Sequence, residues 1–299
     1  MRAGRPPLVQ KLLASVNGRV CPAREATVPA QDEGLLRGDG AYEVVRVYLG
    51  RPFMLAEHLD RLQRSCRIIR LACPRALVER EVATLIEAGG PVSRDIRIVL
   101  TRGGNRLLLM EYQPQWRAAR LAFVADQPRL VLEGAKHLSY AGNMLARRIA
   151  QERGFQEAVL VSPGGRVRES QTAAFFWVTP EGVLCTPPLS EGIVNSVSRS
   201  IVINHMPVEE HPCRLADALG AAEAFLAGTC REIHPIKVIE ERTFEYAPGT
   251  ISGRVGDLYW KEVEAATGVD IEEHLLFLEG ERAAMRKVAR AKSLRRSHR

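Results

Sequence analysis

One lysine lies in a short stretch of small, polar and apolar residues, EGAKHLSYAGNM (residues 133–144), inside a largely apolar part of the chain. Removing an ammonium group from water is costly without partners, so most lysines stay at the surface. A lysine that faces a cavity can instead form an imine with a carbonyl compound. Lys136 is therefore either a solvated loop residue or an amine placed for covalent chemistry.

The commonest cofactor of an imine-forming lysine is pyridoxal 5'-phosphate (PLP), whose ring nitrogen needs an acidic partner. Glu169 follows the PGGR turn and begins the apolar pattern RESQTAAFFWV, where a carboxylate is easily placed in a cavity. A carboxylate buried beside a pyridinium would keep both groups charged. Taken alone, Glu169 is better explained as an exposed turn residue.

A cofactor phosphate needs a helix N-terminus with hydroxyl groups and an arginine. Ser198 lies in GIVNSVSRS, at the start of a predicted helix, and Thr229 follows Gly228 at the end of the apolar strand AFLAG. Arg61, in a predicted helix, could reach the same anion. Each residue also has an ordinary interpretation, because serines often cap helices and helix arginines are often exposed.

The elements that would position these residues divide into two halves. The first half begins with a hairpin pattern around Asn17-Gly18 and a second around Leu49-Gly50. Helices are predicted from AEHLDRLQRSCRIIRL and ALVEREVATLIEAG, followed by the strands DIRIVLTRGG and LLLMEYQP. Strand pairs with two helices make an α+β unit.

The second half follows a segment with two prolines that we interpret as a crossover. It then has a helix in NMLARRIAQERG, strands in EAVLVSP, RESQTAAFFWV and VLCTPPL, a helix from about Ser196 to His205, a short helix RLADALG and strands EAFLAG and IKVIE. Another helix is predicted over 253–267. The expected domains are 1–117 and 129–270, joined by a crossover at 118–128 and followed by a basic extension at 271–299.

The segments that carry these residues, in this order, resemble class IV (fold-type IV) PLP-dependent aminotransferases, a family with branched-chain and D-amino-acid aminotransferases and aminodeoxychorismate lyases. They span about residues 16–267: RGDGAYEVVRVYLGRPFMLAEHLDRLQRS, AKHLSYAGNMLARRIAQERGFQEAVLVSPGGRVRES, TPPLSEGIVNSVSR and AFLAGTCREIHPI carry the match. The resemblance implies an α+β fold with a smaller N-terminal α/β domain and a larger β-rich C-terminal domain. It also implies PLP as cofactor and a homodimer.

Carried over position by position, the resemblance makes Lys136 the imine-forming lysine and Glu169 the partner of the pyridine nitrogen. The phosphate would be bound by Arg61, Val197, Ser198 and Thr229. Tyr42 and Arg46 would line the substrate pocket, since alternate strand residues share a face. Arg97 and Arg102 are candidates for a substrate carboxylate. Their odd separation places them on opposite faces unless the strand ends before Arg102, and we favour Arg102.

The implied reaction is a ping-pong transfer of an amino group from an amino acid to a 2-oxo acid, with Lys136 as general base and then general acid. The alternative within the family is aminodeoxychorismate lyase, which releases pyruvate. Glu43 favours the transaminase modestly. Ala174, Ser196 and Ala141 depart from patterns common in the family, so side-chain preference and the choice of L- or D-substrates stay open.

Composition narrows the remaining possibilities. The 299 residues are 46% hydrophobic and 26% charged, as in ordinary globular proteins, and no apolar run reaches the about 20 residues of a membrane span. Six scattered cysteines have no metal-ligand spacing, which predicts reduced thiols, a cytoplasmic location and no metal site.

The net charge of +7 comes from residues 280–299, which hold eight Lys/Arg and one Glu. A solvated helical or frayed terminus explains this segment better than a nucleic-acid contact. A nucleic-acid-binding protein would show binding that falls steeply with salt and disappears when these residues are removed.

Overall fold

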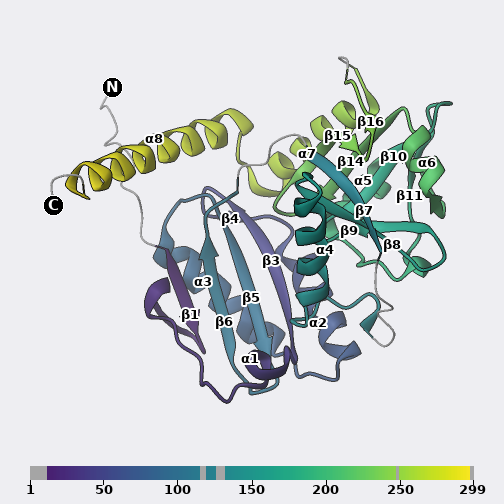
Figure 1. Cartoon of the computed structure of the whole chain (residues 1–299). Helices are drawn as coiled ribbons and strands as arrows, with labels where there is room; N and C mark the ends of the chain where they lie inside the picture. Colours follow the sequence, from purple (N-terminus) through teal and green to yellow (C-terminus); the bar gives the residue numbers. More distant parts are fainter. Residues whose placement is uncertain (1–11, 115–118, 126–131, 247–248, 297–299) are drawn as a thin grey trace.

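The computed structural model describes residues 12–114, 119–125, 132–246 and 249–296, and for 287–296 it gives the helix backbone alone. The strands form two sheets that lie next to each other, and α-helices pack around them, with α4 (Ala141–Glu152) near the boundary between the two sheets (Figure 1). The first residues of the proposed small domain and the last three of the basic extension lie outside the described residues.

The six-stranded sheet belongs to the first part of the chain. In spatial order its strands are β2 (Arg19–Pro22), β1 (Leu13–Val16), β6 (Arg106–Glu111), β5 (Arg94–Thr101), β3 (Gly40–Tyr48) and β4 (Arg51–Pro52). The turns Asn17-Gly18 and Leu49-Gly50 join two of its hairpins, and all four turn residues have positive φ. Such turns match the right-handed twist of paired strands, and both were predicted from the sequence.

Two helices, α2 (Leu55–Ile68) and α3 (Arg75–Gly89), cover one face of this sheet. Leu59, Leu62 and Cys66 of α2 are buried there at the predicted helical spacing. The short helix α1 (Glu33–Arg37) precedes β3 and was not predicted. Side chains of β3 and β5 on the opposite face point toward the second sheet.

The second sheet has ten strands: β12 (Val208–Glu210), β11 (Leu184–Thr186), β10 (Ala174–Val178), β14 (Glu223–Gly228), β15 (Glu232–Ile239), β7 (Ala119–Ala125), β8 (Glu157–Val161), β9 (Arg166–Ser170) and β13 (Cys213–Arg214), with β16 (Arg242–Thr243) beside β15. β9 also pairs with β10 through Glu169 and Ala174. The strands β10, β14, β15, β7, β8 and β9 therefore form a closed ring of neighbours.

The crossover interpretation of 118–128 is wrong for its central part. Residues Ala119–Ala125 form β7, which pairs in parallel with both β8 and β15 inside the large sheet. Pro114 and Pro128 lie outside this strand. The seven residues of β7 contain no proline, so each of them keeps the backbone N–H that strand pairing needs. The large sheet thus begins before residue 129.

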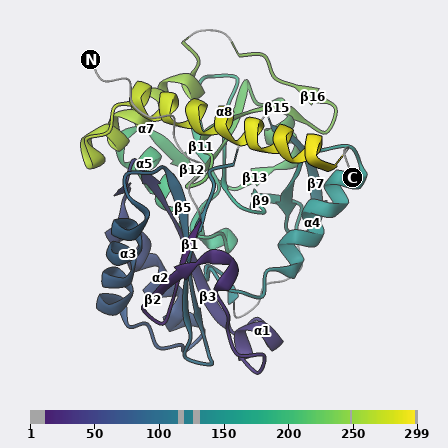
Figure 2. The same cartoon turned by 90° about the vertical axis from the view of Figure 1, so that its left-hand side faces the viewer.

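Helix α4 (Ala141–Glu152) packs on β7 and β8, and α5 (Val197–His205), α6 (Leu215–Gly220) and α7 (Ile251–Thr267) lie around the rest of the large sheet. Helix α8 (Ile271–Arg296) lies along one end of the small sheet (Figures 1 and 2). His274 and Glu281 of α8 are buried. Of these, Glu281 belongs to the segment 280–299 that we expected to be solvated, so the start of that segment packs on the fold.

All six cysteines are free thiols. Within the described ranges, no cluster of three or more His, Cys, Asp or Glu side chains could hold a metal ion. None of the helices described is both long and apolar enough to cross a bilayer.

Candidate active site

The loop that carries Lys136 is bonded through its backbone to the small sheet. The Tyr42 N–H donates to the Lys136 carbonyl at 3.1 Å, and the Leu138 N–H donates to the Gly40 carbonyl at 2.9 Å. The Lys136 N–H donates to the Ser65 hydroxyl of α2 at 3.0 Å. The lysine therefore belongs to a loop that is held against β3 and α2 on both sides.

The side chain of Lys136 meets the phenol of Tyr42. Its Nζ atom lies 3.2 Å from the Tyr42 hydroxyl and 4.3 Å from the centre of the Tyr42 ring. Burial raises the pKa of Tyr42 to about 12, so this phenol stays neutral at ordinary pH. A neutral phenol can hydrogen-bond to the Lys136 amine without forming an ion pair with it.

Gly40 lets the lysine loop come close to β3. A β-carbon on Gly40 would lie 2.4 Å from the Leu100 carbonyl oxygen and 2.6 Å from the Cδ1 atom of Leu138. Both distances are shorter than a side chain can accept, and one of the atoms belongs to the backbone. A residue without a side chain is thus required where β3, β5 and the loop meet.

Glu169 lies near the end of β9, opposite Ala174 of β10. It is buried, and its Oε2 atom accepts a hydrogen bond from the Val194 N–H at 3.3 Å. The segment that follows is held through Gln171, whose carbonyl accepts bonds from the Tyr140 hydroxyl and from the Asn143 side chain, the latter at 3.0 Å. The carboxylate therefore lies at the cavity wall on a fixed backbone.

Arg61 lies under the lysine loop in a buried group with Glu43 and His58. Its Nε and Nη2 atoms donate to the two Glu43 oxygens at 2.7 and 2.6 Å, and His58 Nδ1 is 3.2 Å from Glu43. Burial alone would raise the pKa of Glu43, but Arg61 and His58 hold it well below its usual value. Burial lowers the pKa of His58. Glu43 thus stays ionised and orients the Arg61 guanidinium.

An anion site can be built from the start of α5 and the hairpin between β14 and β15. The Ser196 side chain caps α5 and accepts from the Arg199 N–H at 3.3 Å. Thr229 follows Gly228, whose β-carbon would lie 3.1 Å from that of Ala173, so the hairpin packs tightly on the segment after Glu169. Backbone N–H groups at a helix start and in a tight turn favour a negative charge.

These residues surround a cavity of about 890 Å³ between the two sheets. Its lining includes Tyr42, Arg61, Arg97, Lys136, Glu169, Ser196 and Thr229. The predicted Val197 and Ser198 are the first two residues of α5; both side chains are buried, and the Ser198 hydroxyl is 3.4 Å from that of Tyr259. Ser196 and Val194 are the residues of this segment at the cavity surface.

Of the two arginines proposed for a substrate carboxylate, Arg97 lies at the cavity. Its Nε and Nη2 atoms donate to Glu111 at 2.7 and 2.9 Å, and its guanidinium is 5.6 Å from the centre of the Tyr42 ring. The strand β5 ends at Thr101, so Arg102 lies beyond it. Arg102 donates to Asp39 at 3.1 and 3.3 Å and to the carbonyls of Ile69 and Arg70 at the end of α2, and it is not among the residues that line the cavity, so the geometry favours Arg97 over our preference for Arg102.

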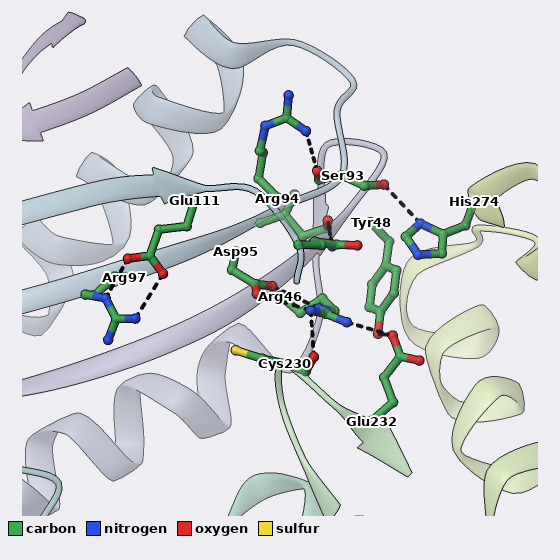
Figure 3. A network of polar contacts seen from close by, with 12 residues as sticks. Arg46, Tyr48, Ser93, Arg94, Asp95, Arg97, Glu111, Cys230, Glu232 and His274 are labelled. Atoms are coloured by element: carbon green, nitrogen blue, oxygen red, sulfur yellow. Dashed lines mark hydrogen bonds and ion pairs between the residues drawn. The ribbon is translucent and has the colours of Figure 1, made fainter. Parts of the chain in front are cut away.

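Arg46 shares a strand face with Tyr42, as predicted, but it does not line the pocket surface formed by the described residues. It is 5% exposed and donates to Asp95 at 2.9 and 3.1 Å and to Glu232 at 2.9 Å (Figure 3). The side chain links the small sheet to β15 of the large sheet, and its donors are taken by these two carboxylates and by the Cys230 carbonyl. The prediction of Arg46 as a pocket residue is therefore wrong.

Several residues at the site were not singled out by the sequence. Tyr140, Arg147 and Arg231 also line the cavity. Arg231 pairs with Glu157 and donates to the Thr172 hydroxyl at 3.2 Å. Tyr140 and Arg231 lie close in the sequence to predicted site residues, four after Lys136 and two after Thr229. In the sequence, Arg147 does not differ from an ordinary exposed arginine of a helix.

The donor set fits PLP. A lysine amine, a buried carboxylate and an arginine near a helix start and a hydroxyl-bearing turn all face one cavity. They provide one group for each of the carbonyl carbon, the ring nitrogen and the phosphate. Gly228 has no side chain, so the backbone just before Thr229 can pack closely on Ala173.

A model of the protein family described as amino-transferase class IV matches residues 40–239. The chain is 29% identical over 286 residues to a putative branched-chain-amino-acid aminotransferase of Methanocaldococcus jannaschii, covering 86% of this chain and 98% of that protein. It is 30% identical to a D-alanine aminotransferase of Listeria monocytogenes, covering 85% and 96%.

Solved structures show the same fold. The branched-chain aminotransferase of Thermoproteus uzoniensis with norvaline has a TM-score of 0.79 and 26% identity, and the match covers 88% of this chain and 97% of that one. The PLP form of the branched-chain amino acid aminotransferase of Thermobaculum terrenum has a TM-score of 0.77 and 24% identity, with 89% and 97% covered.

Proposed function

The chain belongs to the class IV aminotransferases, enzymes that use PLP, and from this membership we propose which of its residues carry the reaction. Lys136 is the amine that binds the cofactor and moves the substrate proton. Glu169 holds the ring nitrogen, and Arg61, the start of α5 and Thr229 hold the phosphate. The observation that carries the proposal is the contact of Lys136 Nζ with Tyr42 at 3.2 Å inside the shared cavity.

PLP supplies an electron sink that stabilises negative charge on the carbon that loses a proton. The chain supplies the rest. Lys136, held from behind by its loop, would take the proton from the substrate carbon as a general base and would give it, as a general acid, to the cofactor carbon that bears the transferred nitrogen. Tyr42 aligns the amine, and Glu169, buried beside Val194, keeps the ring nitrogen charged.

We further propose that the substrate is an amino acid whose carboxylate meets Arg97, with a 2-oxo acid as acceptor. Glu111 fixes the Arg97 guanidinium by two hydrogen bonds, which presents it at the cavity wall near Tyr42. A planar guanidinium binds a carboxylate through two parallel bonds. A lyase reaction is not favoured, since the relatives matched are aminotransferases.

A spectrum of the purified protein tests the assignment of Lys136. The native enzyme is expected to absorb in the visible range as a yellow protein, and Lys136→Ala is expected to lose that band and the turnover of amino acids. Lys136→Arg is the matched control, because it keeps the charge and cannot form the imine. A Lys136→Ala protein with the native spectrum and activity would refute the assignment.

We also infer two domains, built on the two sheets, and a homodimer in the cytoplasm. The apolar side chains of Leu145 and Ile149 on α4 are 53% and 36% exposed at the cavity, where a second copy could cover them. The free thiols support a reducing compartment. Light scattering on a sizing column measures the assembly, and a monomer at all concentrations would contradict the dimer.

A further inference from the structure

The hairpin that carries Thr229 has an unusual residue at its end. Residues 229–231 connect β14 to β15, the Arg231 N–H donates to the Gly228 carbonyl at 2.9 Å, and Gly228 pairs with Glu232. A type I turn in such a hairpin is commonly followed by a residue with left-handed backbone, normally glycine. Here the residue after the turn is Glu232, the first residue of β15, with a φ of 57°. A side chain at that position is costly unless something holds it.

The Glu232 carboxylate is held from the small sheet. Its Oε1 atom accepts from Arg46 Nη1 at 2.9 Å and from the Tyr48 hydroxyl at 3.0 Å (Figure 3). Arg46 Nη2 also donates to the carbonyl of Cys230 at 3.0 Å, in the middle of the same turn. Both contacts come from β3, the strand that also carries Tyr42.

Arg46 is itself fixed. Asp95 on the neighbouring strand β5 accepts from its Nε and Nη2 atoms at 2.9 and 3.1 Å. Arg46 is 5% exposed and Asp95 is 1% exposed. In a site with so little water, these charge-assisted bonds are strong and their geometry is narrow. The guanidinium is therefore a rigid support on which the turn rests.

The opposite side of the turn is packed against the segment that follows Glu169. Gly228 lies against Ala173, and Arg231 donates to the Thr172 hydroxyl at 3.2 Å. The turn is thus gripped between the small sheet and the Glu169 segment. Thr229 lies at the cavity surface between these two supports.

We propose that Glu232 and Arg46 are positioning residues: their ion pair fixes the turn so that the Thr229 hydroxyl and the turn's N–H groups meet the cofactor phosphate. This inference rests on the proposed function, because it takes Thr229 as a phosphate ligand. The pair contacts neither the lysine nor the ring site, so its contribution is to the phosphate part of cofactor binding. Cofactor binding is then assembled from both sheets.

The test compares PLP with pyridoxal, which lacks the phosphate. Apoenzyme is titrated with each compound, and binding is followed by absorption and by tryptophan fluorescence. Glu232→Ala is expected to raise the Kd for PLP by about tenfold and to change the Kd for pyridoxal by less than about twofold. A purely structural defect would weaken both compounds alike.

Two further variants guard the result against misfolding. Glu232→Gly removes the carboxylate but accepts the left-handed backbone readily, so it should fold and still lose part of the preference for PLP. Glu81→Ala removes another buried carboxylate, one that lies on α3 and pairs with Arg106 of β6 at 2.8 Å, and it should leave the ratio of the two Kd values unchanged. An unchanged ratio in both Glu232 variants would overturn the proposal.

Thr229→Val separates this proposal from the assignment on which it rests. If Thr229 binds the phosphate, Thr229→Val loses preference for PLP, and the double variant with Glu232→Ala loses less than the two single losses combined. If Thr229→Val keeps the native ratio, the phosphate assignment is wrong. If Thr229→Val loses the preference and Glu232→Ala keeps it, the positioning role alone is wrong.

Discussion

Tyr42 is the side chain with which the lysine amine is in contact, and its proton is held by burial. Its pKa is raised from 10 to about 12 in the folded protein. A tyrosine in the unfolded chain ionises near pH 10, so between about pH 10 and 12 the unfolded state loses a proton that the folded state keeps. Stability from this group is complete below pH 10 and declines as the pH rises through that window.

Tyr42→Phe should therefore make the protein less sensitive to alkali. Between pH 10 and 12, the native protein is expected to lose about 2–3 kcal/mol of unfolding free energy through Tyr42, and the variant to lose correspondingly less. Urea unfolding at pH 8, 10 and 11 measures the effect, with pH 8 as the internal reference. Parallel pH dependence in both proteins would contradict the assigned pKa.

A kinetic experiment distinguishes Arg97 from Arg102 as the residue that binds the substrate carboxylate. Arg97→Met is expected to raise KM for an amino acid by about tenfold or more, because a charge-assisted pair is lost. The same substitution should leave the KM for the corresponding amine, which has no carboxylate, nearly unchanged. Arg102→Met, which disturbs contacts at the end of α2, is the matched comparison. A larger KM effect in Arg102→Met would move the carboxylate site to Arg102.

At the residue scale, sequence order placed Lys136, Glu169, Arg61 and Thr229 around one cavity, since a family resemblance preserves the order and spacing of such groups. It failed at Arg46 because strand periodicity gives the face of a side chain but not its partner. Asp95 and Glu232, from different parts of the chain, neutralise Arg46 and hold it away from the pocket. Long-range ion pairs of this kind leave no local pattern.

At the element scale, the contact of β3 with the lysine loop depends on Gly40. Gly40→Ala is expected to lower the unfolding free energy by about 1–3 kcal/mol, because the new methyl group must displace a backbone oxygen or Leu138. The displaced loop carries Lys136, so cofactor binding should weaken as well. Chemical denaturation and a PLP titration measure the two effects.

Gly142 is the matched control for that substitution. It lies in the first turn of α4 and is exposed, and a methyl group added to it would meet no atom of the described residues within 4 Å. Gly142→Ala should raise the unfolding free energy by up to about 1 kcal/mol, because alanine favours the helix. Equal losses in both variants would show that contact geometry at Gly40 is not the cause.

Helices and hairpins were predicted well because their signals are local. The periodicity of α2, the cap at Ser196 and the turn Leu49-Gly50 all lie within a few residues. The strand β7 was missed because its seven residues, ARLAFVA, are bordered by prolines and show no strict alternation. Its identity as a strand depends on β8 and β15, which lie much later in the sequence.

At the scale of the whole molecule, α8 is attached to the small sheet by polar contacts. Arg94 donates to Glu281 through two nitrogens at 2.6 and 3.0 Å, and both residues are nearly inaccessible to solvent (Figure 3 shows Arg94). The Ser93 hydroxyl is 3.0 Å from His274 Nδ1. Two neighbouring residues at the start of β5 thus hold two points on α8.

Replacing Glu281 alone should destabilise the fold more than replacing Arg94 and Glu281 together. Glu281→Leu leaves a buried guanidinium without its carboxylate, at a cost of about 3–5 kcal/mol in unfolding free energy. The double variant Arg94→Met with Glu281→Leu is expected to recover most of that loss. Deletion of 287–299 keeps the pair and removes much of the basic charge, so it should change stability little. Urea unfolding of the three proteins measures this order.

The position of β7 has a consequence for how the protein is made on the ribosome. Ala119 pairs with Ile236, more than a hundred residues later in the chain. The small sheet is complete by Glu111 and can form during translation, whereas the ring of strands stays open, with one edge of β7 unpaired, until β15 has left the exit tunnel. The lysine is therefore synthesised long before Thr229 and the start of α5, and a chain truncated before β15 would present an unpaired strand edge at Ala119–Leu121, which favours pairing with other chains.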